Sequence, residues 1–440
     1  MKSSETNVSR VFELRGRWRF LPVAITVALL SGVGIPGHTD DSAGTEQANG
    51  AATVVEIELH PLQPRQWRLI WTSDPTREAT LSWSTREAGS RHVVHLSSAD
   101  GTSQVVTATH NGAYTSSGDT LFYHHARLEN LRPDTRYEVV MESDWQRSPD
   151  FYFRTAPRED RPFSILFGGD SRSDPAMRRQ VNRLMAELTQ RDPQIRCFAH
   201  GGDYINTGSS FAQWRQWLTD HEHTVTDGGR LLPIVPTRGN HDIGPLFEEV
   251  FGFPAGDTNY YALDLSPQVR LVTLNTEISL AGDQRAWLAE ELAASRPRYR
   301  FLLAQYHRPA YPAVKRPGAA KQHWVPLFEQ HNVDLVCEAD GHVIKRTVPI
   351  REDKFDPAGV VYIGEGGLGV PQRQPKSERW YLRDSGMSAR GHHVHVLTFT
   401  EEAIEGRGVG LGGVLLDEFR RARRQRVDSG VGRRNESADR

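Results

Sequence analysis

The sequence predicts two folded parts in series, an all-β sandwich followed by an α/β domain. Between residues 54 and 157, runs of β-branched and aromatic residues are separated by turn segments such as SADG and RPDT, a pattern typical of an antiparallel sandwich. From residue 161 to 415, apolar strands that end in Gly and Asp alternate with helical patterns such as AMRRQVNRLMAELTQ. This alternation favours an α/β layer domain, and 440 residues are enough for both parts.

The first element in chain order is an export signal. Four arginines within the first 19 residues precede the apolar run FLPVAITVALL, which has eleven residues. This length matches the apolar core of a signal peptide, whereas a membrane span needs about 20 residues. We expect residues 1–45 to be a signal peptide and linker, the protein to be secreted or periplasmic, and no membrane span to remain after cleavage. An uncleaved membrane anchor is the alternative.

The predicted sandwich spans residues 54–157. Its LENLRPDTRY segment places Tyr137 where a tyrosine corner would pin one strand to the preceding turn, and in this the segment resembles a fibronectin type III module. The same strands contain His92, His95, His124 and His125. Because neighbouring strand residues point to opposite faces, we expect ordinary strand histidines rather than a metal site.

The C-terminal end has a different composition. Residues 416–440 contain eight arginines from Arg420 onward and few apolar residues. Such a composition cannot bury enough apolar surface to fold. We therefore expect a disordered, Arg-rich tail.

The composition excludes several classes of protein. Lys and Arg number 53 and Asp and Glu 55, so the net charge of -2 gives no basic field for nucleic acid. Two cysteines, Cys197 and Cys337, are too few for a disulfide-rich scaffold or a Cys-rich zinc module, although a bridge between them is conceivable after export. Any metal must therefore be held by His, Asp, Asn or Glu.

Polar residues with metal-binding side chains follow five apolar strands of the α/β part. They are Asp170; Asp203; Asn240, His241 and Asp242; His307; and Asp340 with His342. Loops beyond the carboxyl ends of strands form the sites of α/β domains. Carboxylates mixed with imidazoles suit Zn, Mn or Fe, and a pair of such ions activates water for phosphoryl transfer. The five strand ends together predict a metal centre.

These segments resemble a known family. FGGDSRSD, HGGDYINTG, RGNHD, AQYHRPAY and EADGHVIKRT are similar to the ordered motif blocks of calcineurin-like metallophosphoesterases. With the preceding fibronectin-like module, the resemblance is to purple acid phosphatases and covers roughly residues 60–415. It implies two mixed sheets flanked by helices, which carry a dinuclear centre of Fe, Zn or Mn, either divalent or mixed-valence. It also implies hydrolysis of phosphomonoesters by attack of a metal-bound hydroxide.

The resemblance assigns roles to individual residues. It implies Asp170 on the first metal, Asp203 bridging both metals, and Asn240 and His307 on the second. His241 would contact the phosphate and assist the leaving group. Asn206 occupies the position of the Tyr that binds ferric iron in the family's GDxxY block. We count Asn206 as a metal-site position, but without that phenolate the purple colour and ferric selectivity are in doubt.

Arg172 stands two residues after the first Asp, where the wider family can have a His ligand. A guanidinium stays protonated and cannot bind a metal, but it fits a substrate phosphate bidentately. We therefore place Arg172 among the catalytic residues, with a surface ion pair to Asp174 as the alternative. Lys315 and Arg316, on the loop after His307, are either phosphate contacts or solvated loop charges.

The family's GHxH block is altered. A gap-free alignment of EADGHVIKR puts Asp340 at the first His position and His342 at the second, and both side chains can bind metal. The alternative alignment leaves Ile344 at the second position, where it cannot. We favour the gap-free register because it keeps ligands at both metals.

The sequence therefore predicts an exported dinuclear-metal phosphatase that acts on a phosphorylated small molecule. A phosphodiesterase on the same centre is one alternative. A binding or adhesion protein with a degenerate metal site is the other, favoured by Asn206 and Asp340.

Overall fold

The computed structural model describes residues 60–116 and 119–424. The predicted signal peptide and most of the predicted tail lie outside these ranges. In the described ranges, no helix has the length and apolar character that a membrane crossing requires.

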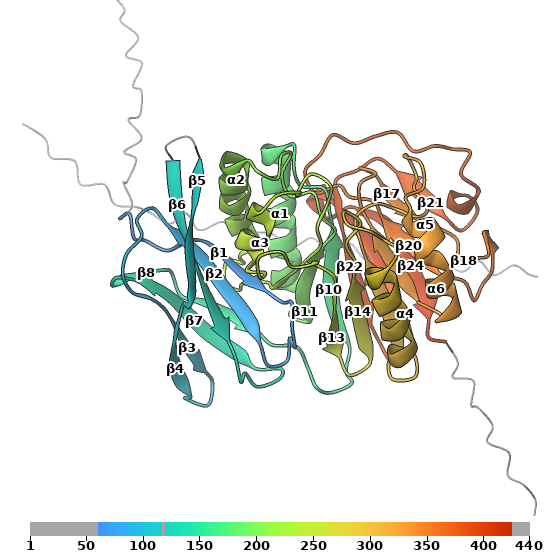
Figure 1. The fold of residues 1–440 in the computed structure, drawn as a ribbon. Helices are drawn as coiled ribbons and strands as arrows, with labels where there is room; N and C mark the ends of the chain where they lie inside the picture. The colour runs from blue at the N-terminus through green and yellow to red at the C-terminus, as the bar shows by residue number, and fades with distance from the viewer. Residues whose placement is uncertain (1–59, 117–118, 425–440) are drawn as a thin grey trace, which may run out of the picture. The chain divides into compact units, whose positions relative to one another are not determined.

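The β-rich part is built of nine strands in two sheets. They are β1 (Arg65–Ile70), β2 (Ala79–Thr85), β3 (His92–Ser98), β4 (Ser103–Thr107), β5 (His110–Ser116), β6 (Asp119–Leu128), β7 (Arg136–Ser143), β8 (Gln146–Arg147) and β9 (Phe151–Arg154). One sheet contains β1, β2, β6 and β5, and the other contains β4, β3, β7 and β8 with β9 on β7 (Figure 1). The buried Trp83, Val94 and Met141 pack between them.

The tyrosine corner and the strand histidines have the local contacts that their positions predict. The Tyr137 hydroxyl accepts a hydrogen bond from the Arg132 N–H at 2.8 Å. His124 lies 2.9 Å from the Thr85 hydroxyl and His125 lies 2.5 Å from the Ser82 hydroxyl. Burial lowers the pKa of His124 to about 3, as expected of a neutral core histidine.

The α/β part begins at β10. Its strands are β10 (Phe163–Gly168), β11 (Ile195–His200), β12 (Ile234–Pro236), β13 (Tyr261–Ser266), β14 (Val269–Thr273), β15 (Phe301–Gln305), β16 (Leu335–Glu338), β17 (Ile344–Arg346), β18 (Ile350–Arg351), β19 (Lys354–Phe355), β20 (Val361–Gly364), β21 (Met387–Ala389), β22 (His393–Phe399), β23 (Ala403–Gly410) and β24 (Leu415–Ala422). Its helices are α1 (Pro175–Arg191), α2 (Phe211–His221), α3 (Leu246–Phe251), α4 (Asp283–Ser295), α5 (Ala320–His323) and α6 (Val325–Gln330), with 3-10 turns η1 (Glu222–Thr224), η2 (Trp380–Leu382) and η3 (Leu411–Gly413).

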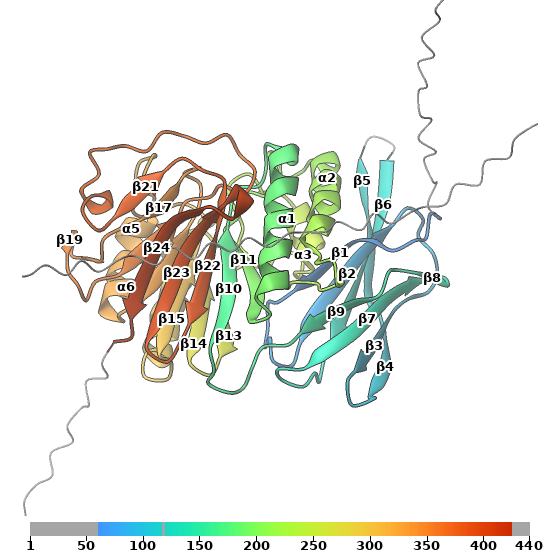
Figure 2. The same ribbon diagram turned by 180° about the vertical axis from the view of Figure 1, so that it is seen from behind.

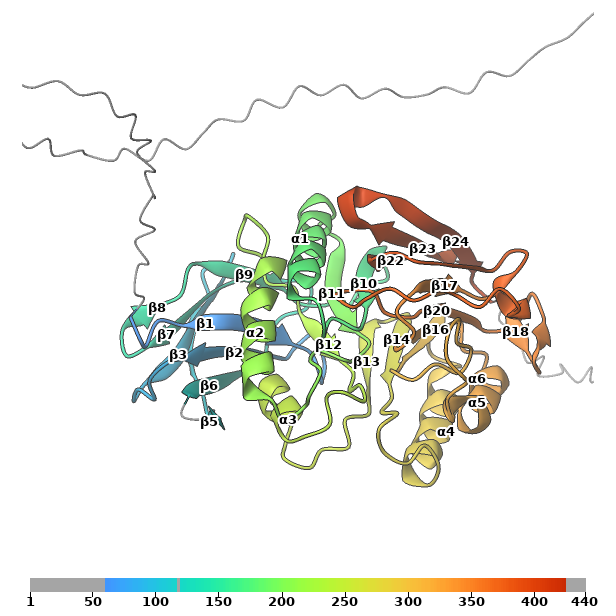
Figure 3. The same cartoon turned by 90° about the horizontal axis from the view of Figure 1, so that it is seen from above.

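Two mixed sheets pack face to face in this part. One has the order β13-β14-β15-β16-β20-β17-β21, and the other contains β24-β23-β22-β10-β11-β12. Phe167 and Leu303 lie in the apolar layer between the sheets. Helix α1 covers one outer face through Val181, and α4 covers the other through Leu288; Figure 3 shows α4–α6 on the opposite side from α1. The predicted fold class, a β-rich part followed by mixed sheets between helices, is confirmed.

The two parts share one sheet. Strand β12 pairs in parallel with β1, with Ile234 opposite Ile70. The sheet therefore continues through β1, β2, β6 and β5 and has ten strands. The sequence predicts a sandwich followed by a separate α/β domain, whereas this pairing makes the β-rich part an extension of one sheet of the α/β part.

The predicted start of the disordered tail, residue 416, falls within a strand. Residues 415–422 form the ordered strand β24, which pairs with β23 in an antiparallel ladder (Figure 2). Its arginines find partners, since Arg421 donates to the carbonyl oxygens of Pro357 and Gly359 at 2.9 and 2.7 Å. The basic composition predicts disorder here because the partners of these arginines are distant in the sequence and cannot be inferred from the segment itself.

The two cysteines, Cys197 and Cys337, are buried and free. The conceivable disulfide between them is not formed in this structure.

Candidate metal centre

The carboxyl ends of four strands bring the predicted ligands together. Asp170, Asp203, His307 and Asp340 follow β10, β11, β15 and β16. One potential ligand atom from each of them lies within 4.8 Å of all the others, and all four residues are buried. Parallel neighbours end at the same edge of a sheet, and two facing sheets bring two such edges together.

The backbone turns sharply at these residues. Asp170, Asp203, Asp340 and His342 have positive φ values of 58°, 60°, 69° and 62°. Such values are uncommon outside glycine and tend to mark functional sites. All four of these left-handed residues lie at the candidate centre.

Two glycines allow the loops to approach the carboxylates. A Cβ on Gly239 would lie 2.5 Å from Oδ1 of Asp203, and one on Gly366 would lie 1.9 Å from Oδ2 of Asp170. A side chain at either position would fill the cradle around these ligands.

Asp170 also faces His342, which is not one of the four residues whose ligand atoms all lie within 4.8 Å of one another. Nε2 of His342 lies 3.4 Å from Oδ1 of Asp170. Both atoms are buried and have no hydrogen-bond partner among the described residues. Buried polar atoms are almost always paired, so a carboxylate oxygen and an imidazole nitrogen that face each other unpaired fit a cation held between them.

His307 anchors the four-residue cluster itself. Its Nε2 lies 3.2 Å from the amide oxygen of Asn240, 3.3 Å from Oδ1 of Asp203 and 3.7 Å from Oδ1 of Asp340. Its Nδ1 lies 2.8 Å from the carbonyl oxygen of Gly201. A proton on Nδ1 leaves Nε2 as the ligand atom, which is the usual support for a metal-binding histidine.

The electrostatics of the cluster also suit a cation. Burial lowers the pKa of His307, but the surrounding carboxylates outweigh burial and raise the pKa well above its usual value. Burial raises the pKa of Asp203, but His307 outweighs that effect and the pKa is lowered. The cluster thus attracts positive charge, which a bound divalent cation supplies in place of a proton.

Asp242 holds the surrounding loops in place. Its carboxylate accepts hydrogen bonds from the backbone N–H groups of Asp203, Tyr204 and Gly239 at 2.7, 2.9 and 2.8 Å. Burial and the charge of Asp203 raise the pKa of Asp242 to about 8. Asp242 therefore supports the centre without joining the cluster.

Arg172 and Asn206 lie beside the cluster. Nε of Arg172 is 3.2 Å from Oδ2 of Asp203, and its terminal nitrogen donates to the Asn206 amide oxygen at 2.6 Å. Asp174 instead caps α1 by accepting from the Met177 N–H at 3.0 Å. Arg172 therefore contacts Asp203 of the cluster, and the alternative ion pair with Asp174 is not the contact that it makes.

His241 lies at the rim of the cluster. Its Nδ1 is 2.7 Å from the carbonyl oxygen of Asn206, and its backbone N–H donates to Oδ1 of Asp203 at 2.9 Å. Tyr204 points the other way, because its buried ring stacks on His200 with centroids 3.8 Å apart.

The structure adds residues that sequence reasoning missed or left open. The ammonium of Lys315 forms an ion pair with Oδ1 of Asp340, and Arg373 donates to the Asp340 carbonyl oxygen at 3.2 Å. The backbone oxygen of Glu365 accepts the His342 N–H at 2.7 Å. In the sequence Lys315 and Arg373 are recognisable only as charged residues without a known partner, and a backbone oxygen leaves no signal.

Comparisons with known proteins agree with this geometry. The family Purple acid Phosphatase, N-terminal domain, matches residues 64–155, and the family Calcineurin-like phosphoesterase matches residues 139–344. The two matched domains make the chain a homologue of purple acid phosphatases.

Similar proteins occur in bacteria and plants. An uncharacterized protein of Mycobacterium tuberculosis is 25% identical over 394 residues, covering 74% of this chain and 70% of the relative. Purple acid phosphatase 23 of Arabidopsis thaliana is 25% identical over 343 residues, covering 67% and 72%. The solved purple acid phosphatase PPD1 of yellow lupin (Lupinus luteus) has a TM-score of 0.70 at 16% identity, and the match covers 83% of this chain and 75% of the lupin chain. That last similarity concerns the fold.

Proposed function

We propose that this protein hydrolyses phosphomonoesters of small molecules at a dinuclear metal centre. One observation supports this most strongly. Oδ1 of Asp170 and Nε2 of His342 are buried without a hydrogen-bond partner among the described residues, beside the group of Asp203, His307 and Asp340.

The proposed ligand sets follow these two groups of contacts. Asp170 and His342 would hold one cation, and their 3.4 Å separation supports this. Asn240, His307 and Asp340 would hold the other, with Asp203 between the two. Asn206 would act through its hydrogen bond to Arg172. Three carboxylates favour harder ions, and Asp340 in place of an imidazole favours Mn over Zn at the second position.

The chain's own residues would bind the substrate and move its proton. When bound, the two cations supply an activated water and neutralise charge on the phosphoryl group. Arg172 and Lys315, which already contact cluster carboxylates, offer N–H donors to the phosphoryl oxygens. The contact with the Asn206 carbonyl oxygen keeps a proton on Nδ1 of His241, so the imidazolium form would be needed for Nε2 to donate a second proton to the leaving oxygen.

Turnover of p-nitrophenyl phosphate and of its bis ester, with Mn or Zn added, tests the proposal. We expect the monoester to be the better substrate, and metal analysis to find two ions per chain. Faster turnover of the bis ester would favour a phosphodiesterase. Full metal content without turnover of either would favour a binding protein.

We also propose export, on the basis of the N-terminal basic and apolar segments. A mature N-terminus beyond residue 30, measured on protein isolated from the medium or periplasm, would support it. An intact residue 1 on membrane-bound protein would favour the uncleaved anchor.

A further inference from the structure

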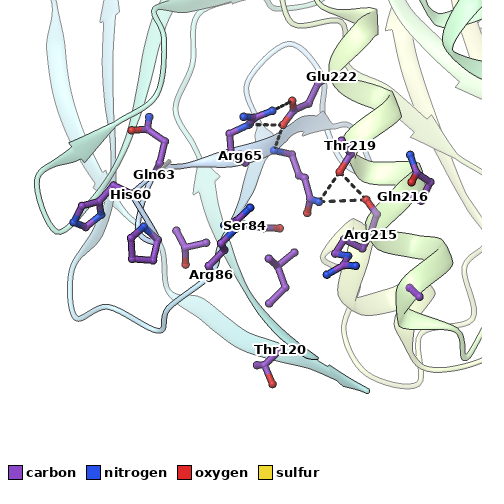
Figure 4. Close-up of a pocket in the computed structure, with 15 residues that line it drawn as sticks. His60, Gln63, Arg65, Ser84, Arg86, Thr120, Arg215, Gln216, Thr219 and Glu222 are labelled. Carbon is purple, nitrogen blue, oxygen red and sulfur yellow. Dashed lines mark hydrogen bonds and ion pairs between the residues drawn. The ribbon is translucent and has the colours of Figure 1, made fainter. Parts of the chain in front are cut away.

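A second pocket lies between the β-rich part and helix α2. Its volume is about 770 Å³, which is within the range of small-molecule sites. Residues of β1, β2 and β6 line one side and residues of α2 line the other, among them Arg65, Ser84, Thr120, Arg215 and Thr219 (Figure 4). No residue of the metal cluster lines it.

Two buried polar atoms belong to residues of this pocket and have no partner within the described ranges. Gln66 is 6% exposed and Ser84 is 1% exposed. Oε1 of Gln66 and Oγ of Ser84 make no hydrogen bond. Because buried polar atoms are rarely left unpaired, two of them beside one cavity indicate a polar ligand.

The backbone is irregular where Gln66 enters the pocket wall. Gln66 has a φ of 57°, and the register of β1 against β2 shifts between Arg65 and Arg68. Nε2 of Gln66 donates to the carbonyl oxygen of Arg215 at 3.2 Å and to the hydroxyl of Thr219 at 3.0 Å. A bulge redirects a side chain, and strained residues cluster at binding sites. Here the bulge turns the amide of a β-strand residue toward α2.

The pocket carries more positive than negative charge. Arg65, Arg86, Arg215 and Glu222 are its charged lining residues. Glu222 is engaged by Arg65, with contacts of 3.1 and 2.5 Å. Arg86 is exposed, and no carboxylate of the described residues pairs with it. The Arg86 guanidinium would therefore attract an anion here.

Helix α2 separates this pocket from the metal centre. Ala212, Arg215 and Thr219 line the pocket. Gln213 accepts the backbone N–H of Asn206 at 2.8 Å, toward the catalytic loops. The pocket is thus a distinct site that shares one helix with the centre.

We propose that this pocket binds a hydroxylated organic anion of sugar size. Arg86 would hold its carboxylate or phosphate-type group, because a guanidinium group forms paired hydrogen bonds with either. Hydroxyl groups of the ligand would satisfy Ser84 Oγ and Gln66 Oε1. The inference does not rest on the proposed phosphatase activity.

Calorimetric titration of the full chain tests the proposal. The probes are D-glucuronate and D-glucose 6-sulfate, which contain no phosphate ester, and D-glucose is the uncharged counterpart. We expect one equivalent of at least one anion to bind, and glucose to bind at least about tenfold more weakly, as loss of a charge-assisted hydrogen bond implies. Preference for glucuronate would indicate that the pocket's ligand is a sugar acid, and preference for the sulfate would indicate that it is a sugar phosphate.

Three variants locate the binding. Arg86→Gln alters an exposed side chain and Ser84→Ala removes only an unpaired hydroxyl, so both should keep the wild-type melting temperature. Each should weaken binding about tenfold, whereas Arg158→Gln, a matched exposed arginine elsewhere, should leave it unchanged. No binding of either anion, or binding that Arg86→Gln and Ser84→Ala leave intact, would overturn the proposal.

Discussion

Replacement of Lys315 by Met should strengthen binding of the second cation. The Lys315 ammonium contacts Oδ1 of Asp340, an oxygen that the proposed centre needs for that cation. A cation bound there must displace the ammonium or remain beside it. Removal of the positive charge eliminates this competition while the methionine keeps a similar side-chain length.

The magnitude follows from distance and exposure. Two unit charges about 4 Å apart interact by about 4 kcal/mol at an effective dielectric constant of about 20. The Lys315 side chain is 38% exposed, so water screens the repulsion and the flexible chain can swing away. We therefore expect a gain of about 1 to 2 kcal/mol, which is about five- to thirtyfold in the dissociation constant.

The assay is a titration of metal-free protein with Mn or Zn, with the second equivalent resolved by competition with a chelating dye. Arg316→Met is the control, since Arg316 is an exposed charge on the same loop. In an Asp340→Asn background the Lys315→Met change should add little, because the two residues act through one contact. Unchanged or weaker binding of the second cation by Lys315→Met would refute the competition.

Three further predictions concern the metal centre. His241→Ala should lower turnover about 10²- to 10⁴-fold with metal content intact; wild-type turnover in a steady-state assay would contradict its role. Asp203→Ala should lose both metals and all activity, so elemental analysis that finds two ions per chain would reject the bridge. The iron-loaded protein should lack a tyrosinate band in its visible spectrum, because Asn206 replaces the phenol and Tyr204 stacks on His200 away from the cluster; a band lost in Tyr204→Phe would show that this placement is wrong.

Local patterns in the sequence predict the fold class and the candidate ligands. Alternating apolar and polar residues, and apolar runs that end in Asp, are patterns within segments of a few residues. These patterns are enough to predict the five strand ends that carry the candidate ligands. Tyr204 points away from the cluster as expected, but the alternation of an extended strand is not the reason, because Asp203 has a left-handed φ of 60°. The left-handed backbone at Asp170, Asp203, Asp340 and His342 cannot be predicted in this way, because these residue types only tolerate that conformation.

Charged and basic segments mislead for a related reason. An Arg-rich stretch indicates disorder when its charges have no partners. Arg421 donates to the carbonyl oxygens of Pro357 and Gly359, some sixty residues earlier. Lys315, treated as either a phosphate contact or a solvated charge, contacts Asp340.

By itself the sequence determined that the chain has a β-rich part and an α/β part, and that Asp, Asn and His residues end successive strands. Only the tertiary structure decided that β12 pairs with β1 in one ten-stranded sheet, that His342 faces Asp170, and that a bulge at Gln66 opens onto a charged pocket. The physical reason is that backbone periodicity depends on neighbouring residues, whereas strand pairing, ion pairs and cavities depend on contacts between segments far apart in the chain.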